Sequence, residues 1–271
     1  MAFVPPTSPS SSRPSRPVVL VTGAARRLGR TIALELAQHG YDVAVHYRGS
    51  EADAHDTVDA LRAARAHAAC AHAFRADLAD EAACKALVPS VAAHFGRLDA
   101  VVNNASAFEY DDAASFGHAA MDKHWRANTA PAVLLAQALH AHAIAAGSRG
   151  CVVNIVDQKL WNPNPDYFSY TLSKAALQAA IVMLAQALAP VLRVVGVAPG
   201  VTLPSGTMNG SEFEQAHRLT PLQRSSTPDD IARAVRFLIE SPAITGTTLL
   251  VDGGQHLAAQ PRDVLYLAKQ S

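Results

Sequence analysis

Short apolar runs alternate with helical segments along most of this chain, and few folds are compatible with that order. The runs are rich in valine and isoleucine and are short enough to be single buried strands. Strands that alternate with helices form βαβ units, in which the strands are parallel and helices cover both faces of the sheet. The alternation therefore predicts an α/β fold, a doubly wound parallel sheet in three layers.

The expected elements follow one another without a break in composition. Segments with the composition of strands are 17–23, 41–47, 71–78, 98–106, 150–157, 192–200 and 245–254. Segments with the spacing of helices are 30–40, 51–66, 81–96, 118–146, 167–189 and 227–240. A chain of 271 residues can hold one large domain or two small ones. Because no linker interrupts the pattern, we expect one domain over residues 17–271.

The N-terminal stretch, residues 1–16, is rich in proline and serine and contains no continuous apolar run. Its composition predicts a disordered or loosely ordered tail and argues against a signal peptide. No later stretch reads as long and apolar enough to span a bilayer.

The charge and the cysteines limit the classes of partner and the compartment. The formal net charge is zero, so nothing favours nucleic acid or an anionic membrane surface as a partner. Cys70, Cys84 and Cys151 are far apart in sequence and read as reduced thiols of a cytoplasmic protein. The 12 histidines show no ligand spacing, and we expect no metal site.

A glycine-containing turn follows the first expected strand and opens the first helix. In "VTGAARRLGR", Gly23 and Gly29 allow close approach of a pyrophosphate to a helix N-terminus, although Arg27 stands where a middle glycine often occurs. The second strand ends in "HYRGS", with Arg48 and Ser50 and no acidic residue to hold a ribose hydroxyl. Arg27 and Arg48 together suit a 2′-phosphate, which favours NADPH over NADH; the alternative is that both are solvated surface arginines.

The helix over 167–189 carries a tyrosine and a lysine on one face. Tyr170 and Lys174 are four residues apart, so Lys174 can lower the pKa of the Tyr170 phenol and make it a proton donor. Alone, this spacing is also common by accident on helix surfaces. Tyr167 is the alternative tyrosine, with a packing or capping role at the start of the helix.

Asp157 ends the strand over 150–157. Aspartate at such a position can be a simple turn or cap residue. In a doubly wound sheet, however, ligands bind beyond the carboxyl ends of the strands, which places Asp157 at the functional edge.

Taken together, these motifs resemble the short-chain dehydrogenase/reductase family. The resemblance rests on the glycine turn, on "NNAS" after the fourth strand, on Asn128, on Tyr170 with Lys174, and on "PG" after the sixth strand, and it covers nearly all of the chain beyond the tail. It implies a single Rossmann-type domain with a seven-stranded parallel sheet, often a homotetramer, that binds NADP(H). Tyr170 is then the acid, Lys174 also holds the nicotinamide ribose, and Asn128 holds a water of a proton relay.

The resemblance also implies a set of cofactor-binding positions. Asp77 in "ADL" matches the acid that contacts adenine, and Pro199 and Gly200 border the nicotinamide. The complete expected set is Gly23, Arg27, Leu28, Gly29, Arg48, Ser50, Asp77, Leu78, Asn104, Ala105, Ser106, Tyr170, Lys174, Pro199 and Gly200.

One position departs from the general family pattern. A serine usually stands thirteen residues before the tyrosine, and here that residue is Asp157. A serine hydroxyl only polarises a carbonyl, whereas a carboxyl can carry a whole proton or hold an amine-rich substrate. Lys174 favours its charged form and burial favours its neutral form, and the sequence leaves that balance open.

The aspartate is shared with one branch, the pteridine reductases, which the chain also resembles in "HYRGS", "NNASAF", "YTLSKAAL" and "TGTTLLVDGG". The branch implies NADPH-dependent reduction of pterins, including dihydrofolate. Its substrate-binding positions correspond to Ser106, Phe108, Asp157 and Tyr170, with the Phe108 ring stacked on the pterin. A loop residue that only packs on the core is the alternative for Phe108.

Two further segments are expected near the substrate. The polar stretch 201–222 is longer than a connection requires and predicts a lid. The stretch 157–168 also faces the site, with Trp161 as a pocket wall or as an anchor of its loop. Other hypotheses remain: reduction of another carbonyl or cyclic imine, or NADPH binding without catalysis.

Overall fold

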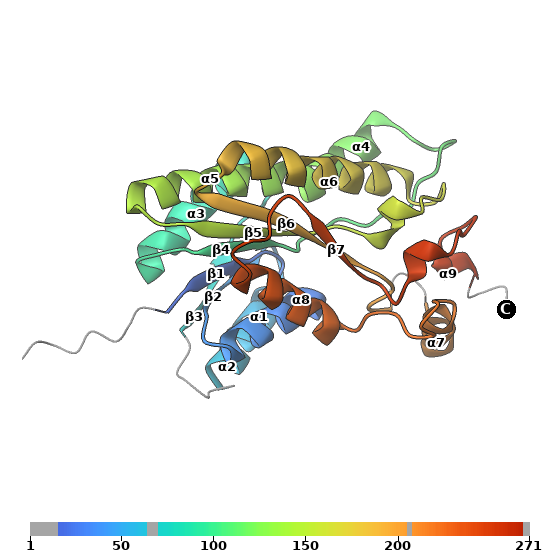
Figure 1. Ribbon diagram of the computed structural model, residues 1–271, viewed down its shortest axis with the longest axis horizontal. Helices are drawn as coiled ribbons and strands as arrows, with labels where there is room; N and C mark the ends of the chain where they lie inside the picture. Colours follow the sequence, from blue (N-terminus) through green and yellow to red (C-terminus); the bar gives the residue numbers. More distant parts are fainter. Residues whose placement is uncertain (1–15, 64–69, 205–207, 268–271) are drawn as a thin grey trace, which may run out of the picture.

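The computed structural model describes residues 16–63, 70–204 and 208–267, which form a seven-stranded parallel sheet (Figure 1). The strand order is β3-β2-β1-β4-β5-β6-β7, and every pair of neighbours is parallel. The strands are β1 (Val18–Val21), β2 (Asp42–Tyr47), β3 (Ala71–Arg75), β4 (Ala100–Asn103), β5 (Gly150–Ile155), β6 (Leu192–Pro199) and β7 (Thr248–Val251). The predicted fold class and strand number are confirmed.

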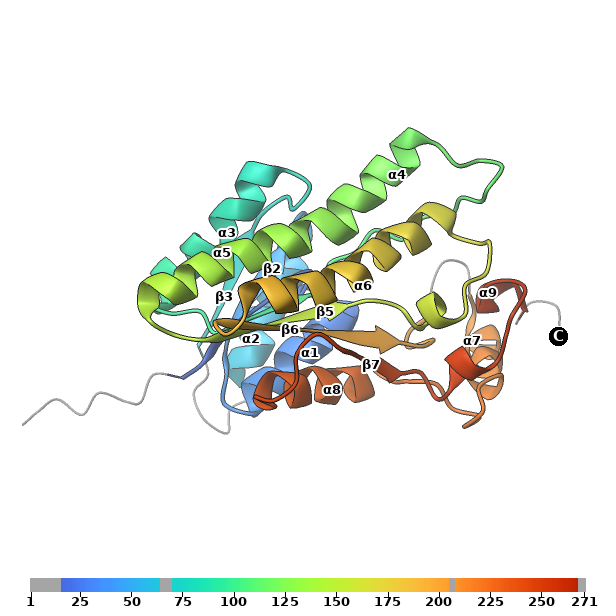
Figure 2. The ribbon, with the colours of Figure 1, turned by 45° about the horizontal axis from the view of Figure 1, so that its top comes forward.

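Helices cover both faces of the sheet, giving three layers (Figures 1 and 2). One face carries α1 (Arg27–Gln38), α2 (Glu51–Ala63) and α8 (Pro228–Glu240). The other carries α3 (Glu81–Phe95), a long run from α4 (His118–His124) into α5 (Ala130–Ala146), and α6 (Phe168–Leu188). Each layer thus contains helices that are far apart in sequence.

Side chains of alternate strand positions fill the two interlayer cores. On β1, Val19 and Val21 face α1 and α8, whereas Val18 and Leu20 face the opposite helices. This period of two matches the pleat of a strand buried on both faces, so the strands read as continuous apolar runs.

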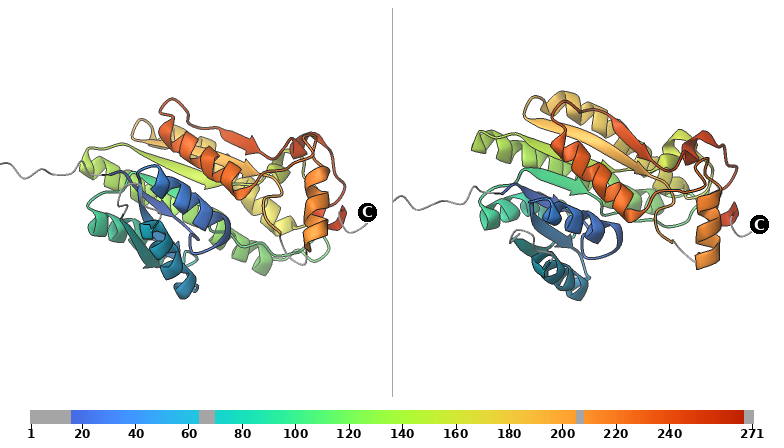
Figure 3. Two further views of the ribbon diagram at one scale, coloured as in Figure 1. Left: turned by 90° about the horizontal axis from the view of Figure 1, so that it is seen from below. Right: turned by 60° about the horizontal axis from the view of Figure 1, so that its bottom comes forward.

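The carboxyl ends of the strands meet at one edge of the sheet, and a small extra layer lies beyond that edge (Figure 3). It consists of α7 (Gly210–Arg218), α9 (Val264–Leu267) and the 3-10 turns η2 (Gln158–Trp161) and η3 (Gln255–Leu257). A third apolar cluster joins α7 and α9 to the start of α6: Tyr167, Tyr170, Met208, Ala216, Val264 and Leu265. Ligand sites of doubly wound sheets lie at this edge, where the connections that follow the neighbouring strands β1 and β4 lead to opposite sides of the sheet.

Some elements differ from the sequence expectation. The helix expected over 118–146 contains one π-helical turn, η1 (Trp125–Thr129), which includes Asn128. A π turn is an insertion that rotates the residues after it, and it often marks a functional position. Two helices were not expected: α9 follows the helix over 227–240, and α7 lies within the expected lid. Nearly all of the expected tail, and residues 205–207 of the expected lid, lie outside the described residues.

The expectation that no segment is long and apolar enough to cross a bilayer is wrong by length and composition. The run 118–146 and α6 both reach that length and apolarity. Their inner faces pack on the sheet in the second core, as the central helices of an α/β domain do.

Candidate active site

Three adjoining hollows run along the carboxyl edge of the sheet. The inner cavity, of about 280 Å³, is lined by Asp157, Tyr170 and Lys174 together with the strand end at Pro199 and Gly200. The loop hollow is lined by the glycine turn and by Arg48 and Ser50. The outer hollow is lined by Asp77, Leu78 and the same Arg48. Ser106 lines all three, so they form one groove.

The groove brings together nearly every residue expected at the site. Apart from Asn128, each expected position lines at least one hollow: Gly23, Arg27, Leu28, Gly29, Arg48, Ser50, Asp77, Leu78, Asn104, Ala105, Ser106, Phe108, Asp157, Tyr170, Lys174, Pro199 and Gly200.

Glycine is required at both ends of the turn after β1. Gly23 has φ +63°, which L residues with side chains rarely adopt. A Cβ on Gly29 would lie 2.3 Å from the Gly23 carbonyl oxygen, so the helix start could not approach the turn. The turn is therefore as tight as close contact with a phosphate requires.

Thr22 and Asn104 fasten the turn to the end of β4. The Thr22 hydroxyl accepts hydrogen bonds from the backbone N–H groups of Asn104 and Ala105, at 2.9 and 3.0 Å. The Asn104 amide donates to the carbonyl oxygens of Thr22 and Gly23, at 2.8 and 3.3 Å. These bonds fix the glycine turn against the end of β4 in the groove.

His46, which the sequence analysis did not single out, supports the same turn from β2. Its Nδ1 accepts a hydrogen bond from the Gly23 backbone N–H at 3.1 Å, and its Nε2 is 3.1 Å from the Ala76 carbonyl oxygen. Accepting at Nδ1 requires a neutral ring with its proton on Nε2. Burial lowers the pKa of His46 to about 4, so the ring stays neutral near pH 7.

The two expected phosphate-binding arginines have different surroundings. Arg27 has φ +53° at the start of α1, and its guanidinium donates to the Pro204 carbonyl oxygen at 2.8 Å. Arg27 therefore reaches from the loop hollow to the segment after β6. Arg48 lies at the end of β2 and lines the loop and outer hollows, beside Ser50 in the former. Their joint role at a 2′-phosphate stays a prediction.

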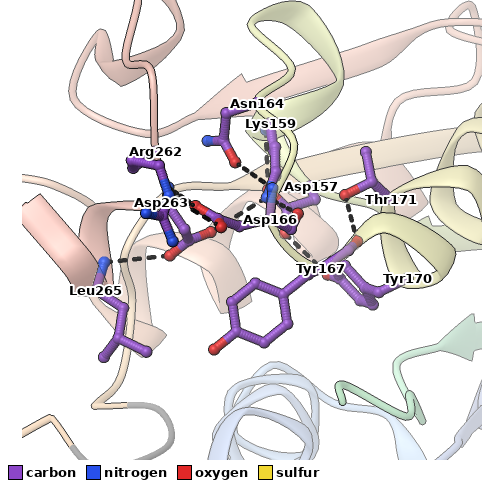
Figure 4. Close-up of polar contacts among 10 residues, drawn as sticks. All are labelled: Asp157, Lys159, Asn164, Asp166, Tyr167, Tyr170, Thr171, Arg262, Asp263 and Leu265. Carbon is purple, nitrogen blue, oxygen red and sulfur yellow. Dashed lines mark hydrogen bonds and ion pairs between the residues drawn. The ribbon is translucent and has the colours of Figure 1, made fainter. Parts of the chain in front are cut away.

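Tyr170 and Asp157 are in direct contact in the inner cavity (Figure 4). The Tyr170 hydroxyl donates to Asp157 Oδ2 at 2.8 Å, and Asp157 Oδ1 accepts from the Lys159 backbone N–H at 2.8 Å. Tyr170 projects from the first turn of α6, and Asp157 caps the 3-10 turn η2 directly after β5. Asp157 is thus both the cap residue of η2 and a residue of the inner cavity.

Burial dominates the ionisation of this pair. Burial, followed by the charge of Asp157, raises the pKa of Tyr170 well above its ordinary value. Burial also raises the pKa of Asp157, against the hydrogen bonds that it accepts from Lys159 and Tyr170. The net lowering of the Tyr170 pKa expected from Lys174 is therefore not found, because burial and the Asp157 charge raise that pKa. The phenol keeps its proton, and the carboxyl can take one up.

Lys174 lies under the pair on α6. Its Nζ donates to the Ile155 carbonyl oxygen at 2.8 Å and lies 5.8 Å from the centroid of the Tyr170 ring. Burial lowers the pKa of Lys174 to about 8, partly offset by Asp157. Lys174 is therefore charged at pH 7 and loses its charge as the pH rises through about 8.

Asn128 lies in the π turn, and its side chain connects this turn to residues 106–107 after β4 and to α6 by hydrogen bonds. Its Oδ1 accepts from Ser106 Oγ and the Ala107 N–H, at 3.1 and 2.7 Å. Its Nδ2 donates to the Ala107 carbonyl oxygen and to Ser173 Oγ, at 3.0 and 2.9 Å. Both lone pairs and both hydrogens of the amide are thus engaged. The proton relay expected of Asn128 stays a prediction, and these contacts do not support it for the side chain.

Phe108 forms an aromatic wall of the inner cavity, supported from behind by Tyr167. The two rings are stacked, with centroids 4.1 Å apart and planes 16° apart, and the Tyr170 ring meets Phe108 edge-on at 4.7 Å. Tyr167 is buried and has φ +54°, a strained backbone for a residue with a side chain. Phe108 remains 41 % exposed, so part of its ring is free for a flat ligand.

The remaining cavity wall was missed from the sequence. Gln260, Asp263 and Val264, near the C-terminus, line the inner cavity together with Lys159 and Asn164 of the β5–α6 connection. No motif marks these residues, because their proximity to Asp157 arises only from the fold. Trp161 is 39 % exposed and does not line the described cavity, which favours an anchoring role.

Comparison with known proteins agrees with the geometry. The enoyl-(acyl carrier protein) reductase family model matches residues 23–256. Pteridine reductase 1 of Leishmania tarentolae is 34% identical over 91% of this chain and 99% of that protein. A 3-oxoacyl-[acyl-carrier-protein] reductase, FabG of Staphylococcus aureus, is 32% identical over 88% and 97%.

Solved structures give the same result. The FolM alternative dihydrofolate reductase 1 of Brucella canis, crystallised with NADP, is 38% identical and has a TM-score of 0.84, over 92% of this chain and 98% of that one. The residues, the fold and the relatives agree: the chain belongs to the short-chain dehydrogenase/reductase family.

Proposed function

We propose that this protein is an NADPH-dependent reductase of pterins, with dihydropterins and dihydrofolate as the substrate class. The observation that carries the proposal is the Asp157 carboxyl hydrogen-bonded to the Tyr170 hydroxyl, in a cavity with an aromatic wall at Phe108. Flat, amine-rich heterocycles have hydrogen-bond donors that a carboxylate accepts and a face that stacks on an aromatic ring.

The groove fits a dinucleotide. The tight turn at Gly23 and Gly29 suits a pyrophosphate at the N-terminus of α1, and Arg48 with Ser50 suits a 2′-phosphate. Asp77 and Leu78 in the outer hollow suit the adenine, and Lys174 suits the nicotinamide ribose. The FolM structures of Brucella canis and Brucella suis, both solved with NADP, support the same cofactor. When bound, NADPH supplies the hydride.

The residues of the inner cavity supply the proton. Hydride addition to a carbon of a C=N bond leaves negative charge on the nitrogen, and the Tyr170 hydroxyl donates its proton to that atom. The phenoxide that remains is adjacent to the Asp157 carboxylate, whose raised pKa allows it to take up a proton from solvent after the transfer and pass it to Tyr170. The Lys174 ammonium stabilises the phenoxide while it exists.

The aspartate separates pterins from simple ketones. A ketone has only an acceptor oxygen, which an ionised Asp157 repels, whereas the amino group of a pterin donates to it. Reduction of another carbonyl or cyclic imine is the second candidate, and the similarity to FabG of Staphylococcus aureus supports it. Binding of NADPH without turnover is the third, and the intact Tyr170–Lys174 pair argues against it.

Turnover with purified protein tests the proposal. NADPH oxidation is followed at neutral pH with dihydrobiopterin, dihydromonapterin and dihydrofolate, and with a panel of ketones and cyclic imines. We expect turnover of at least one pterin at a higher kcat/KM than any member of the panel. Turnover of the panel alone supports the second candidate, and NADPH binding with no turnover supports the third.

A homotetramer in the cytoplasm completes the proposal. Large apolar side chains are exposed on η1, α5 and α6, which pack side by side: Trp125, Ile144, Leu172 and Met183. We propose that another copy of the chain covers this helical face. The three free cysteines suit a reducing compartment. Light scattering of the purified protein tests the assembly.

A further inference from the structure

Lys159 connects Asp157 to Asp166 of the same β5–α6 connection and to Asp263 of the C-terminal segment (Figure 4). Its backbone N–H donates to Asp157 Oδ1, as described above. Its side chain is buried, and Nζ donates to the Asp166 carbonyl oxygen at 2.5 Å and pairs with Asp263 Oδ2 at 3.3 Å. The backbone and the side chain of one residue thus hold the Asp157 carboxyl and the C-terminal segment.

The C-terminal segment is fixed by a second buried carboxylate. Asp166 is 2 % exposed; its two carboxylate oxygens share a bifurcated hydrogen bond from Arg262 Nε, at 3.0 and 2.8 Å, and Oδ2 also accepts from the Asp263 backbone N–H at 2.7 Å. Asp263 Oδ1 accepts from the Leu265 N–H at 3.1 Å, at the start of α9. The Asp263 carboxylate is therefore held at a defined position beside Lys159.

The Lys159–Asp263 pair belongs to the wall of the inner cavity and not to the protein exterior. Both residues line the cavity with Asp157, and their side chains are only 5 % and 17 % exposed. An ion pair at such a position is weakly screened by water, so each charge acts on neighbouring groups.

We infer that Lys159 and Asp263 are positioning residues, which hold Asp157 against Tyr170 and set the pH range in which Asp157 can donate a proton. This inference rests on the proposed function of Asp157. It assigns to the C-terminal segment a part in the reaction, although that segment supplies no catalytic residue.

The groups that face Asp157 act on it in opposite directions. They are Tyr170 and Lys174 from α6, Lys159 from η2 and Asp263 from the C-terminal segment. Burial raises the pKa of Asp157 most, the hydrogen bonds from Lys159 and Tyr170 lower it, the Asp263 charge raises it, and the Lys159 charge lowers it. Removal of each charge of the pair must therefore shift the pKa of Asp157 in a different direction.

Two single variants test this opposition. Lys159→Met keeps the length of the side chain and removes its charge, and Asp263→Asn keeps acceptors for Lys159 and Leu265. The pH dependence of kcat/KM is measured for wild type and both variants with the best pterin. We expect the acid pKa of the profile to rise in Lys159→Met and to fall in Asp263→Asn, each by roughly half a unit to one unit.

Two further readouts separate positioning from a general structural role. In Lys159→Met we expect kcat to fall by about tenfold while the Kd of NADPH is unchanged, since the Asp157 carboxyl that returns the proton to Tyr170 is displaced and the cofactor groove is not. Asp59→Asn is the matched control, because it removes an exposed carboxylate paired with Arg62 at 3.7 Å and lines none of the hollows. It should change neither the profile nor kcat.

Shifts in the same direction, or no shift in either variant, overturn the inference. If Lys159→Met does not fold, the direction of the shift in Asp263→Asn decides alone. If wild type reduces no pterin, the proposed function fails separately. The inference is then tested by carbon-13 NMR titration of Asp157 in the complex with NADP⁺, assigned with Asp157→Asn, where the same opposite shifts are expected.

Discussion

The Tyr170 hydroxyl and the Asp157 carboxylate are 2.8 Å apart, although they come from different elements and are separated by thirteen residues. Burial holds the proton on the phenol and favours a proton on the acid as well. In the function that we propose, this pair, and not the tyrosine–lysine pair alone, transfers the proton, and the first prediction tests that role.

Tyr170→Phe should lower kcat by about 10²–10⁴-fold, the range expected for loss of a general acid. The Kd of NADPH should change by less than about threefold, because the phenyl ring still fills its place between Phe108 and the α6 backbone. Steady-state kinetics and a fluorescence titration with NADPH measure the two quantities. An equal loss of both would contradict the acid role.

Activity should also decline at alkaline pH because of Lys174. The ammonium is charged below its lowered pKa of about 8 and neutral above it. Its stabilisation of the Tyr170 phenoxide is therefore present at pH 7 and lost as the pH rises through about 8. The alkaline limb of kcat/KM should have an apparent pKa near that value, and Lys174→Met should have low activity without that limb. A wild-type profile that stays flat to pH 10 would exclude this role.

The preference for NADPH should depend on Arg48. Arg48→Ala removes the guanidinium that lines the loop and outer hollows, so kcat/KM with NADPH should fall by about tenfold or more while that with NADH changes little. Arg233→Ala is the matched control, because Arg233 is an exposed arginine that pairs with Asp230 and lines none of the three hollows, so its removal should leave the selectivity unchanged. Unchanged selectivity in Arg48→Ala would assign the phosphate to Arg27 or another group.

His46 should make the folded state sensitive to mild acid. Its pKa is about 4 in the folded protein and near 6.5 when unfolded, so the unfolded state binds more protons between these values. The stabilisation is therefore complete above pH 6.5 and is lost as the pH falls toward 4, by up to about 3 kcal/mol. Urea unfolding at pH 7.5 and pH 5 measures the difference.

A glutamine at position 46 separates titration from hydrogen bonding. His46→Gln retains an acceptor for the Gly23 N–H and a donor for Ala76, but it does not titrate. This variant should lose much of the difference between pH 7.5 and pH 5, whereas His46→Leu should be less stable at both. An unchanged pH dependence in His46→Gln would assign it to other groups.

The sequence predicted the parts of the fold that depend on local order. Parallel strands buried on both faces read as apolar runs, as in Val18–Val21, so the sheet and its carboxyl edge could be derived. The placement of Tyr170 and Lys174 on one helix face could also be predicted, because residues four apart on a helix are neighbours. Gly23 and Gly29 belong to the same class, since a tight turn requires them locally.

Features that depend on tertiary contacts could not be derived. Lys159 and Asp263 are 104 residues apart and meet only through packing at the sheet edge. The π turn at Asn128 and the positive φ of Tyr167 are local distortions that surrounding contacts maintain. The direction of the pKa shift of Tyr170 was misjudged for the same reason, because burial is a property of the folded chain.

The central claim is that Asp157 directs this reductase toward a nitrogen heterocycle, and a comparison of wild type with Asp157→Ser tests it most directly. The serine restores the residue usual in the family at this position. We expect wild type to reduce a dihydropterin with a kcat/KM at least 100 times that for any ketone tested, on the order of 3 kcal/mol of discrimination. In Asp157→Ser, kcat/KM for the pterin should fall by about tenfold or more, with no loss for the ketones. Equal losses for both substrate classes, or a wild type that prefers ketones, would contradict the claim.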